Sequence, residues 1–295
     1  MPSFGLRPTQ PFRLDLTSWV LRRRPDNAWD LWDGETYRRV LVVEGVPMDA
    51  SVVQRGDELL VTLSGARMSS RITEQVIASL RKLLGIDVDL SAFYRFARSD
   101  SRLGPLAERF RGFKPPRFLT LFEGLVNGVS CQQLSLTVGI ILLNRLVERY
   151  GREIHGRQAF PEPSDLKSAD PEHLVQLGYS HNKARSLIEL AQAISDGRFQ
   201  PASVEQASDR DALVALSNSA ASGVGPPNTR CYAVWAEQTS SRAMMSVVAT
   251  TWNNGWVCAN RSPMTALRAY SENGRHTEVS STFTCCWIMC SIWDT

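Results

Sequence analysis

The side chains of this chain that could do chemistry gather at a few points. The segment Cys131–Ser135, CQQLS, places two glutamine amides and a hydroxyl between two apolar helical patterns, where they could form hydrogen bonds to a partner. Lys183 could face a phosphate or could be an ordinary surface charge. Cys285, Cys286 and Cys290 could bind a metal, but their spacing does not fit a paired C-x-x-C zinc site. We therefore expect no metal and no cofactor.

Helical periodicity on both sides of CQQLS indicates what must position it. Ser135 is placed to cap the second helix, and Gly151 to end it. Taken alone, the pattern predicts a buried helical hairpin with two glutamines at its turn. The apolar positions at helical spacing are Leu121, Phe122, Leu125, Val126 and Val129 before the turn and Leu136, Ile140, Leu143, Leu146 and Val147 after it.

The order of residues in FEGLVNGVSCQQLSLTVG, residues 122–139, resembles the "F..LV..I..QQLS" motif of the helix-hairpin-helix DNA glycosylases. The most similar branch is the DNA-3-methyladenine glycosylase II family. The resemblance implies that Leu134 wedges into the gap left by a flipped base and that its neighbours Gln133 and Ser135 contact DNA. A second family pattern, "LG.S..KA..L..LA..I..G", covers residues 177–197 and includes Lys183, for which it implies a DNA contact.

The predicted fold class is α+β. An N-terminal antiparallel β-sheet domain with helices is expected over residues 1–113, and a mostly helical glycosylase domain, incomplete, over residues 114–216. Paired prolines in Lys114-Pro115-Pro116 suggest the boundary. The expected elements are strands at Tyr37–Glu44 and Glu58–Ser64, a turn at Gly45-Val46-Pro47, a helix from Ser70 to Gly85, and helices near Leu90–Ala97 and Leu103–Phe110.

Composition sets broad limits on the class of protein. The chain has 295 residues, a net charge of +3 and 43% hydrophobic residues, which permits a polyanionic partner without demanding one. No run of about 18 apolar residues is present, and the N-terminus lacks a long apolar segment. We therefore expect a cytoplasmic protein without a membrane span. The resemblance adds the expectation of a bacterial-type protein that acts as a monomer on double-stranded DNA with alkylated bases.

The last part of the chain has an anomalous composition. Residues 217–295 contain one leucine, Leu267, and no lysine, yet hold five of the six cysteines. Reading the codons one step out of frame from Ser217 permits the family hairpin G-I-G-R-W-T-A and then V-F-P-G-D-D-V-G, which holds the family aspartate. The ATG codons of Met244 and Met245 force that aspartate. We therefore predict a frameshifted, poorly ordered tail that leaves the apolar face of Leu136–Val147 exposed.

The resemblance implies hydrolysis of the N-glycosidic bond of alkylated purines such as 3-methyladenine, with base flipping. The cationic base would favour an aromatic wall, at about 1–2 kcal/mol, and Trp19 is a candidate for it, although a core tryptophan is an equal alternative. In the printed frame no catalytic residue is identified. The chain could therefore be a catalytically dead DNA-binding remnant. A third alternative, an oxidised-purine glycosylase/lyase, would need a catalytic lysine in the hairpin region, where none is printed.

Overall fold

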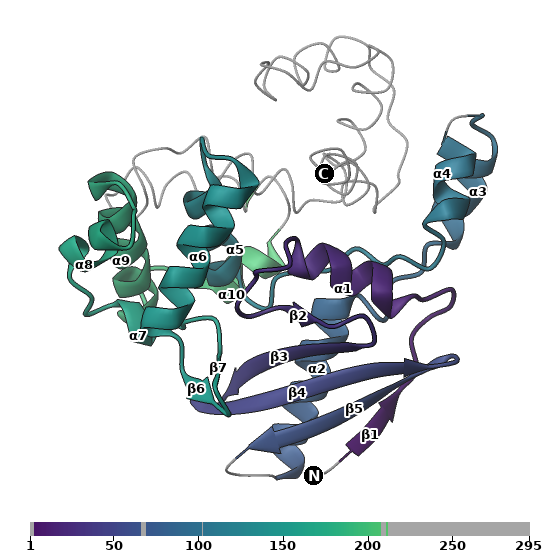
Figure 1. Ribbon diagram of the computed structural model, residues 1–295, viewed down its shortest axis with the longest axis horizontal. Coiled ribbons are helices and arrows are strands. Elements are labelled where there is room, and N and C mark those ends of the chain that lie inside the picture. Colours follow the sequence, from purple (N-terminus) through teal and green to yellow (C-terminus); the bar gives the residue numbers. More distant parts are fainter. Residues whose placement is uncertain (1–2, 66–68, 102, 208–210, 212–295) are drawn as a thin grey trace.

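The computed structural model describes residues 3–65, 69–101, 103–207 and 211. These form an antiparallel sheet with associated helices, followed by a helical region at one end of the sheet (Figure 1). The α+β prediction is therefore confirmed. The predicted tail at 217–295, with Met244 and Met245, lies outside the described residues.

Five strands make the sheet in the order β1-β5-β4-β3-β2, with every pairing antiparallel. They are β1 (Ser3–Leu6), β2 (Leu31–Trp32), β3 (Thr36–Val43), β4 (Val46–Arg55) and β5 (Glu58–Gly65). The predicted strands correspond to β3 and β5. The predicted turn was misplaced, because Pro47 lies in β4 opposite Val42. Glu44 and Gly45 make the turn instead, both with positive φ, as a two-residue hairpin loop that follows the twist of the strands requires.

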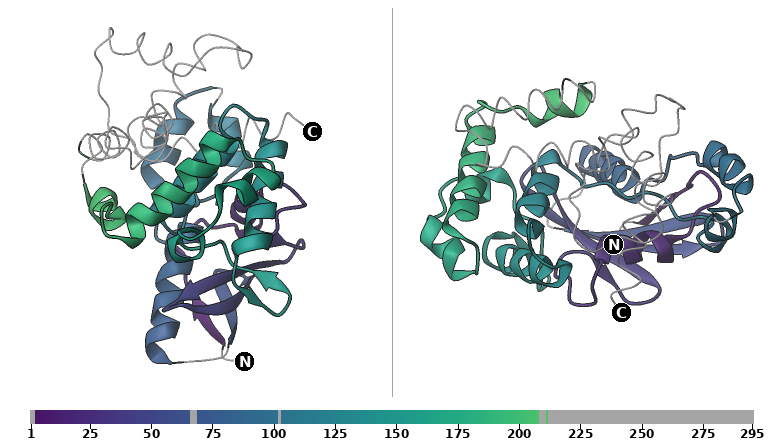
Figure 2. Two further views of the ribbon diagram at one scale, coloured as in Figure 1. Left: turned by 90° about the vertical axis from the view of Figure 1, so that its left-hand side faces the viewer. Right: turned by 90° about the horizontal axis from the view of Figure 1, so that it is seen from above.

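Helix α2 (Ser70–Leu84) packs on this sheet through an apolar stripe that includes Val76 and Leu80. Its cap is Ser69, whose hydroxyl accepts a hydrogen bond from the Ile72 N–H at 3.2 Å, one residue before the expected Ser70. The helices α3 (Ser91–Arg98) and α4 (Leu103–Arg109) match the expected positions. They lie at the opposite end of the molecule from α7 to α9 (Figure 1, Figure 2).

The helical region is built around the predicted hairpin. The hairpin consists of α5 (Leu121–Cys131) and α6 (Leu136–Tyr150). The remaining elements are β6 (Glu153–Ile154), β7 (Arg157–Gln158), α7 (Pro163–Leu166), α8 (Pro171–Gln176), α9 (His181–Ser195) and α10 (Pro201–Gln206).

The apolar face of α6 is buried, contrary to the expectation that it is left exposed. Ile140, Leu143, Leu146 and Val147 have no exposed surface, because residues of α5 and α9 pack in the same core. At the end of α6, Gly151 is needed for space, since a Cβ there would come within 2.2 Å of the Ala159 carbonyl oxygen.

The two predicted domains interlock. Trp29 belongs by sequence to the N-terminal part, but it is 1% exposed and packs in the core of the helical region. Its ring meets Phe160 edge-on at 5.5 Å between centroids. From the other side, Arg157 of β7 pairs with Asp49 of β4. The position of the hairpin is therefore fixed against the sheet.

Candidate nucleic-acid interface

The hairpin turn has a strained backbone. The Leu134 N–H donates to the Cys131 carbonyl at 3.3 Å, and the two residues between them have φ −60°, ψ 129° at Gln132 and φ 57° at Gln133. This is the pattern of a type II turn, whose third position favours glycine or asparagine. A glutamine there costs roughly 1–3 kcal/mol. Strain of this kind is concentrated at functional sites, so the turn is a candidate for one.

The residues predicted to contact DNA are brought together on the surface. Gln133, Leu134 and Ser135 are all exposed, and the Leu134 side chain is 41% exposed. One turn of helix further, Val138 is 42% exposed, so an apolar pair stands at the tip of the hairpin. Ser135 also caps α6 as predicted, because its hydroxyl accepts a hydrogen bond from the Val138 N–H at 3.3 Å.

Close packing below the turn fixes the angle at which α5 meets α6. Gly139 lies against Cys131, and a Cβ on Gly139 would be 2.5 Å from the Cys131 sulfur and 3.1 Å from its Cα. Only glycine therefore allows this approach without a shift.

Burial raises the pKa of the Cys131 thiol, while the positive charges of Arg23 and Lys183 act to lower it. Two cations thus lie near the base of the turn.

Lys183 points at the hairpin rather than standing as a simple surface charge. Its ammonium donates to the Gln132 carbonyl at 2.8 Å and approaches the Ser130 carbonyl at 3.4 Å. Both carbonyls lie at the C-terminal end of α5, which carries partial negative charge. Beside this contact, the hydroxyls of Ser130 and Tyr179 form a buried hydrogen bond of 2.9 Å.

The N-terminal part of the chain contacts α6 near its start, at Thr137, and in its middle, at Asn144. Arg24 donates to the Thr137 hydroxyl at 2.9 Å, and Asn144 accepts from the Ala28 N–H at 2.9 Å while donating to the Asp26 carbonyl at 2.6 Å. Arg24 also pairs with Asp26 at 3.0 Å, so it brings an ion pair beside the exposed turn. No local sequence pattern predicts this contact of Arg24 with α6.

A buried ion network ties the hairpin to the sheet. Arg39 of β3 donates to Asp30 at 2.8 Å and to both oxygens of Glu123 at 2.7 and 2.8 Å. The Tyr37 hydroxyl donates to the same Asp30 carboxylate. Burial, and then the Asp30 charge, hold the pKa of Tyr37 well above its usual value. Desolvation acts to lower the pKa of Arg39, but the neighbouring carboxylates hold it well above its usual value.

Trp19, the candidate wall of a base pocket, is half-buried in α1 (Leu14–Arg22). It packs against a small cluster around Val20 and Phe113, so the described structure accounts for it as a packing residue. Its role in a base pocket stays a prediction.

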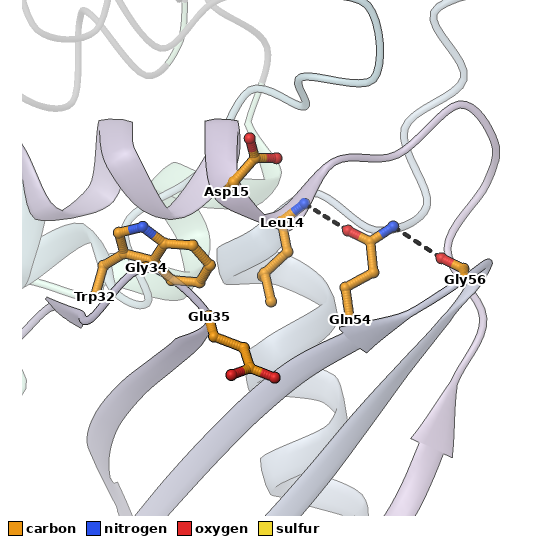
Figure 3. A pocket seen from close by; sticks show the side chains of 7 residues that line it. All are labelled: Leu14, Asp15, Trp32, Gly34, Glu35, Gln54 and Gly56. Atoms are coloured by element: carbon orange, nitrogen blue, oxygen red, sulfur yellow. Dashed lines mark hydrogen bonds between the residues drawn. The ribbon is translucent and has the colours of Figure 1, made fainter.

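An open pocket of about 310 Å³ lies where α1 begins, between Trp32, Glu35 and Gln54 (Figure 3). Gln54 crosses it, accepting from the Leu14 N–H at 2.8 Å. Because Asp15 and Glu35 line this pocket, its charge does not suit a phosphate.

Within the described part of the chain, no group of three or more histidine, cysteine, aspartate or glutamate side chains is arranged to hold a metal ion. Cys285, Cys286 and Cys290 lie outside it. No helix in the described ranges is long and apolar enough to cross a membrane.

Residues 126–254 match the family model described as HhH-GPD superfamily base excision DNA repair protein. The matched range starts within α5 and continues past Leu216, where the motifs read from the sequence ended. The chain is 26% identical over 157 residues to the DNA-3-methyladenine glycosylase of Bacillus subtilis, covering 52% of this chain and 51% of that protein. It is 32% identical over 111 residues to DNA-3-methyladenine glycosylase 2 of Escherichia coli, covering 36% and 39%. The chain thus spans about half, or less, of the length of these relatives.

Solved structures of DNA glycosylases share the fold. The 3-methyladenine DNA-glycosylase of Archaeoglobus fulgidus superposes with a TM-score of 0.72 at 20% identity, covering 100% of this chain and 98% of that one. The 8-oxoguanine glycosylase/lyase of Clostridium acetobutylicum, in complex with double-stranded DNA, superposes with a TM-score of 0.63 at 16% identity, covering 92% and 89%.

Proposed function

Because this chain belongs, through residues 126–254, to the HhH-GPD superfamily of base excision DNA repair proteins, we propose that it is a DNA glycosylase for alkylated purines such as 3-methyladenine. Its reaction is hydrolysis of the N-glycosidic bond after the damaged nucleotide has been flipped out of the duplex. Its partner is double-stranded DNA, on which it acts as a monomer in the cytoplasm. The relatives named for 3-methyladenine support this choice over an oxidised base.

The exposed, strained turn at Gln133 and Leu134 is the observation that carries this proposal. A flipped base leaves an apolar gap in the stack, and the exposed Leu134 side chain can fill it and block the return of the base. Gln133, at the tip of the turn, has an amide that can donate to and accept from base edges. Arg24, which is paired with Asp26 at 3.0 Å, lies beside the turn, where the phosphate backbone would pass.

Catalysis is assigned to a group outside the described residues. Alkylation at N3 or N7 makes the purine cationic and therefore a good leaving group, so the main need is a carboxylate that stabilises the positive sugar or orients water. We propose that the codons of Met244 and Met245 supply this aspartate when the frame is shifted by one step. In the printed frame the chain then binds damaged DNA without cutting it.

Binding and catalysis are tested separately. Fluorescence anisotropy compares the 295-residue chain on a duplex with an abasic analogue and on an intact duplex. We expect tighter binding to the abasic duplex, and a loss of up to about 2–3 kcal/mol in Leu134→Ala. The control is Leu60→Ala in β5, since Leu60 is 43% exposed on a different element. Equal affinity for both duplexes, unchanged by Leu134→Ala, contradicts the proposed function.

Release of 3-methyladenine from methylated DNA tests the frame. We expect none from the printed chain and release after one reading-frame step is restored near Ser217. Release by the printed chain would overturn the frameshift account and leave the glycosylase proposal intact. Sequencing the gene across codon 217 gives an independent answer.

A further inference from the structure

Lys183 was expected to contact DNA, but its surroundings give it another task. It is half-buried, and its ammonium donates to the Gln132 carbonyl at 2.8 Å with the Ser130 carbonyl at 3.4 Å. Gln132 is the second residue of the type II turn, so this hydrogen bond acts on the peptide that leads directly into Gln133. A lysine committed to these two carbonyls is badly placed to neutralise a phosphate at the surface.

The start of α9 holds Lys183 in this position. Ser180 caps α9, and its hydroxyl accepts a hydrogen bond from the Lys183 N–H at 3.4 Å. Directly before the cap, the buried Tyr179 hydroxyl bonds to the Ser130 hydroxyl at 2.9 Å. Two side chains, those of Tyr179 and Lys183, thus attach the start of α9 to the end of α5, next to the turn that presents Leu134.

We propose that Lys183 is a positioning residue, which holds the Gln132–Gln133 peptide in the strained turn and thereby keeps Leu134 presented as a wedge. The inference rests on the proposed function for its wedge, but the contact itself can be tested without DNA. Two carbonyls at the end of a helix repel each other when they point the same way, and the ammonium compensates both. Removing it lets the turn relax toward a backbone that glutamine prefers.

Amide hydrogen exchange in the free 295-residue chain tests the contact first. We expect the Leu134 N–H, which closes the turn, to exchange faster in Lys183→Met and at the native rate in Lys183→Arg, which can still donate to the carbonyls. The charge-matched control is Lys167→Met, since Lys167 is exposed. If Lys183→Met does not fold, Lys183→Ala, which also cannot donate to the carbonyls, replaces it. Native exchange in the Met or Ala variant overturns the proposal.

Salt dependence separates positioning from phosphate contact. A lysine on phosphate contributes about 0.9 to the slope of log K against log salt and weakens all DNA equally. We expect Lys183→Met to keep the slope and to lose about tenfold in affinity for the abasic duplex only. In the Leu134→Ala background the same change should have little further effect. A slope reduced by about 0.9, with equal weakening on intact DNA, overturns the positioning role.

The experiments distinguish failure of the proposed function from failure of the proposed role of Lys183. If the native chain does not distinguish the abasic duplex, the proposed function fails, while the exchange of Leu134 still decides whether Lys183 holds the turn. If Leu134→Ala weakens abasic binding but Lys183→Met changes neither binding nor exchange, only the inference about Lys183 fails.

Discussion

The buried ion network around Arg39 predicts that two arginine-to-methionine substitutions lower thermal stability by very different amounts. Arg39 meets Glu123 at 2.7 Å with 1% and 4% of their side chains exposed. Arg55 meets Glu35 at the same 2.7 Å, but with 60% and 63% exposed. The distance is therefore matched, whereas burial differs and Arg39 also pairs with Asp30 at 2.8 Å, so Arg55→Met is the exposed control for Arg39→Met.

The magnitude follows from what each substitution leaves behind. Arg39→Met strands two carboxylates, Asp30 and Glu123, each 4% exposed, and an uncompensated buried charge costs roughly 3–5 kcal/mol. Arg55→Met leaves Glu35 in water, and exposed pairs are worth about 0–1 kcal/mol. For a chain of this size, Arg39→Met should lower the Tm by roughly 6–20 °C.

Thermal unfolding followed by circular dichroism measures both variants under the same conditions. A second variant, Arg39→Met with Glu123→Gln, should recover part of the loss because it leaves one buried carboxylate fewer. Equal shifts in Arg39→Met and Arg55→Met, or a loss below about 1 kcal/mol for Arg39→Met, would refute the reasoning that this network joins the hairpin to the sheet.

Two further outcomes are expected from local geometry. Gly139→Ala gains about 1 kcal/mol of helix propensity, but the new methyl group overlaps Cys131, which costs about 1–3 kcal/mol. Thermal unfolding should therefore show a net loss of stability, which Cys131→Ala partly restores. A net gain of stability contradicts the close approach of the two helices. The N–H groups of Thr36 and Glu35 donate to Asp33 and hold its pKa at about 2. Because this pKa is depressed, the stabilisation is present above pH of about 4 and is lost as the pH falls toward about 2. Asp33→Asn should remove this acid dependence, and an NMR titration that places the native Asp33 pKa near its ordinary value of about 4 contradicts it.

Local sequence patterns were sufficient to predict the two helices of the hairpin. Apolar spacing predicted both α5 and α6, and Ser135 was recognised as the cap because its position before the second pattern is a local feature. The same kind of signal failed by one residue at Ser69 and Ser70, where two adjacent serines can each serve as the cap. The turn at Glu44 and Gly45 was missed because Pro47 was taken as part of the turn.

Local sequence patterns did not predict contacts between residues that are far apart in the chain. Arg39 and Glu123 are 84 residues apart, and their pairing depends on the register of β3 and on the docking of α5 against it. The family pattern implied a DNA contact for Lys183, but such a pattern does not say whether its side chain faces solvent or the end of α5. Its direction is set by Tyr179 and Ser180, which fix where α9 begins relative to that end.

Gln133 has a positive φ, which glutamine disfavours. The turn must therefore be stabilised by contacts with residues outside its own segment. Glutamine gains nothing in its own segment from a positive φ, so the conformation persists only if the surroundings determine it. Gly139 permits α6 to close on Cys131, and Lys183 fixes the carbonyl before Gln133. Each of these contacts comes from a different helix, so the exposed Leu134 is presented only when the whole helical region has assembled. Local sequence therefore identifies the tip of the hairpin, whereas the assembled fold determines its shape.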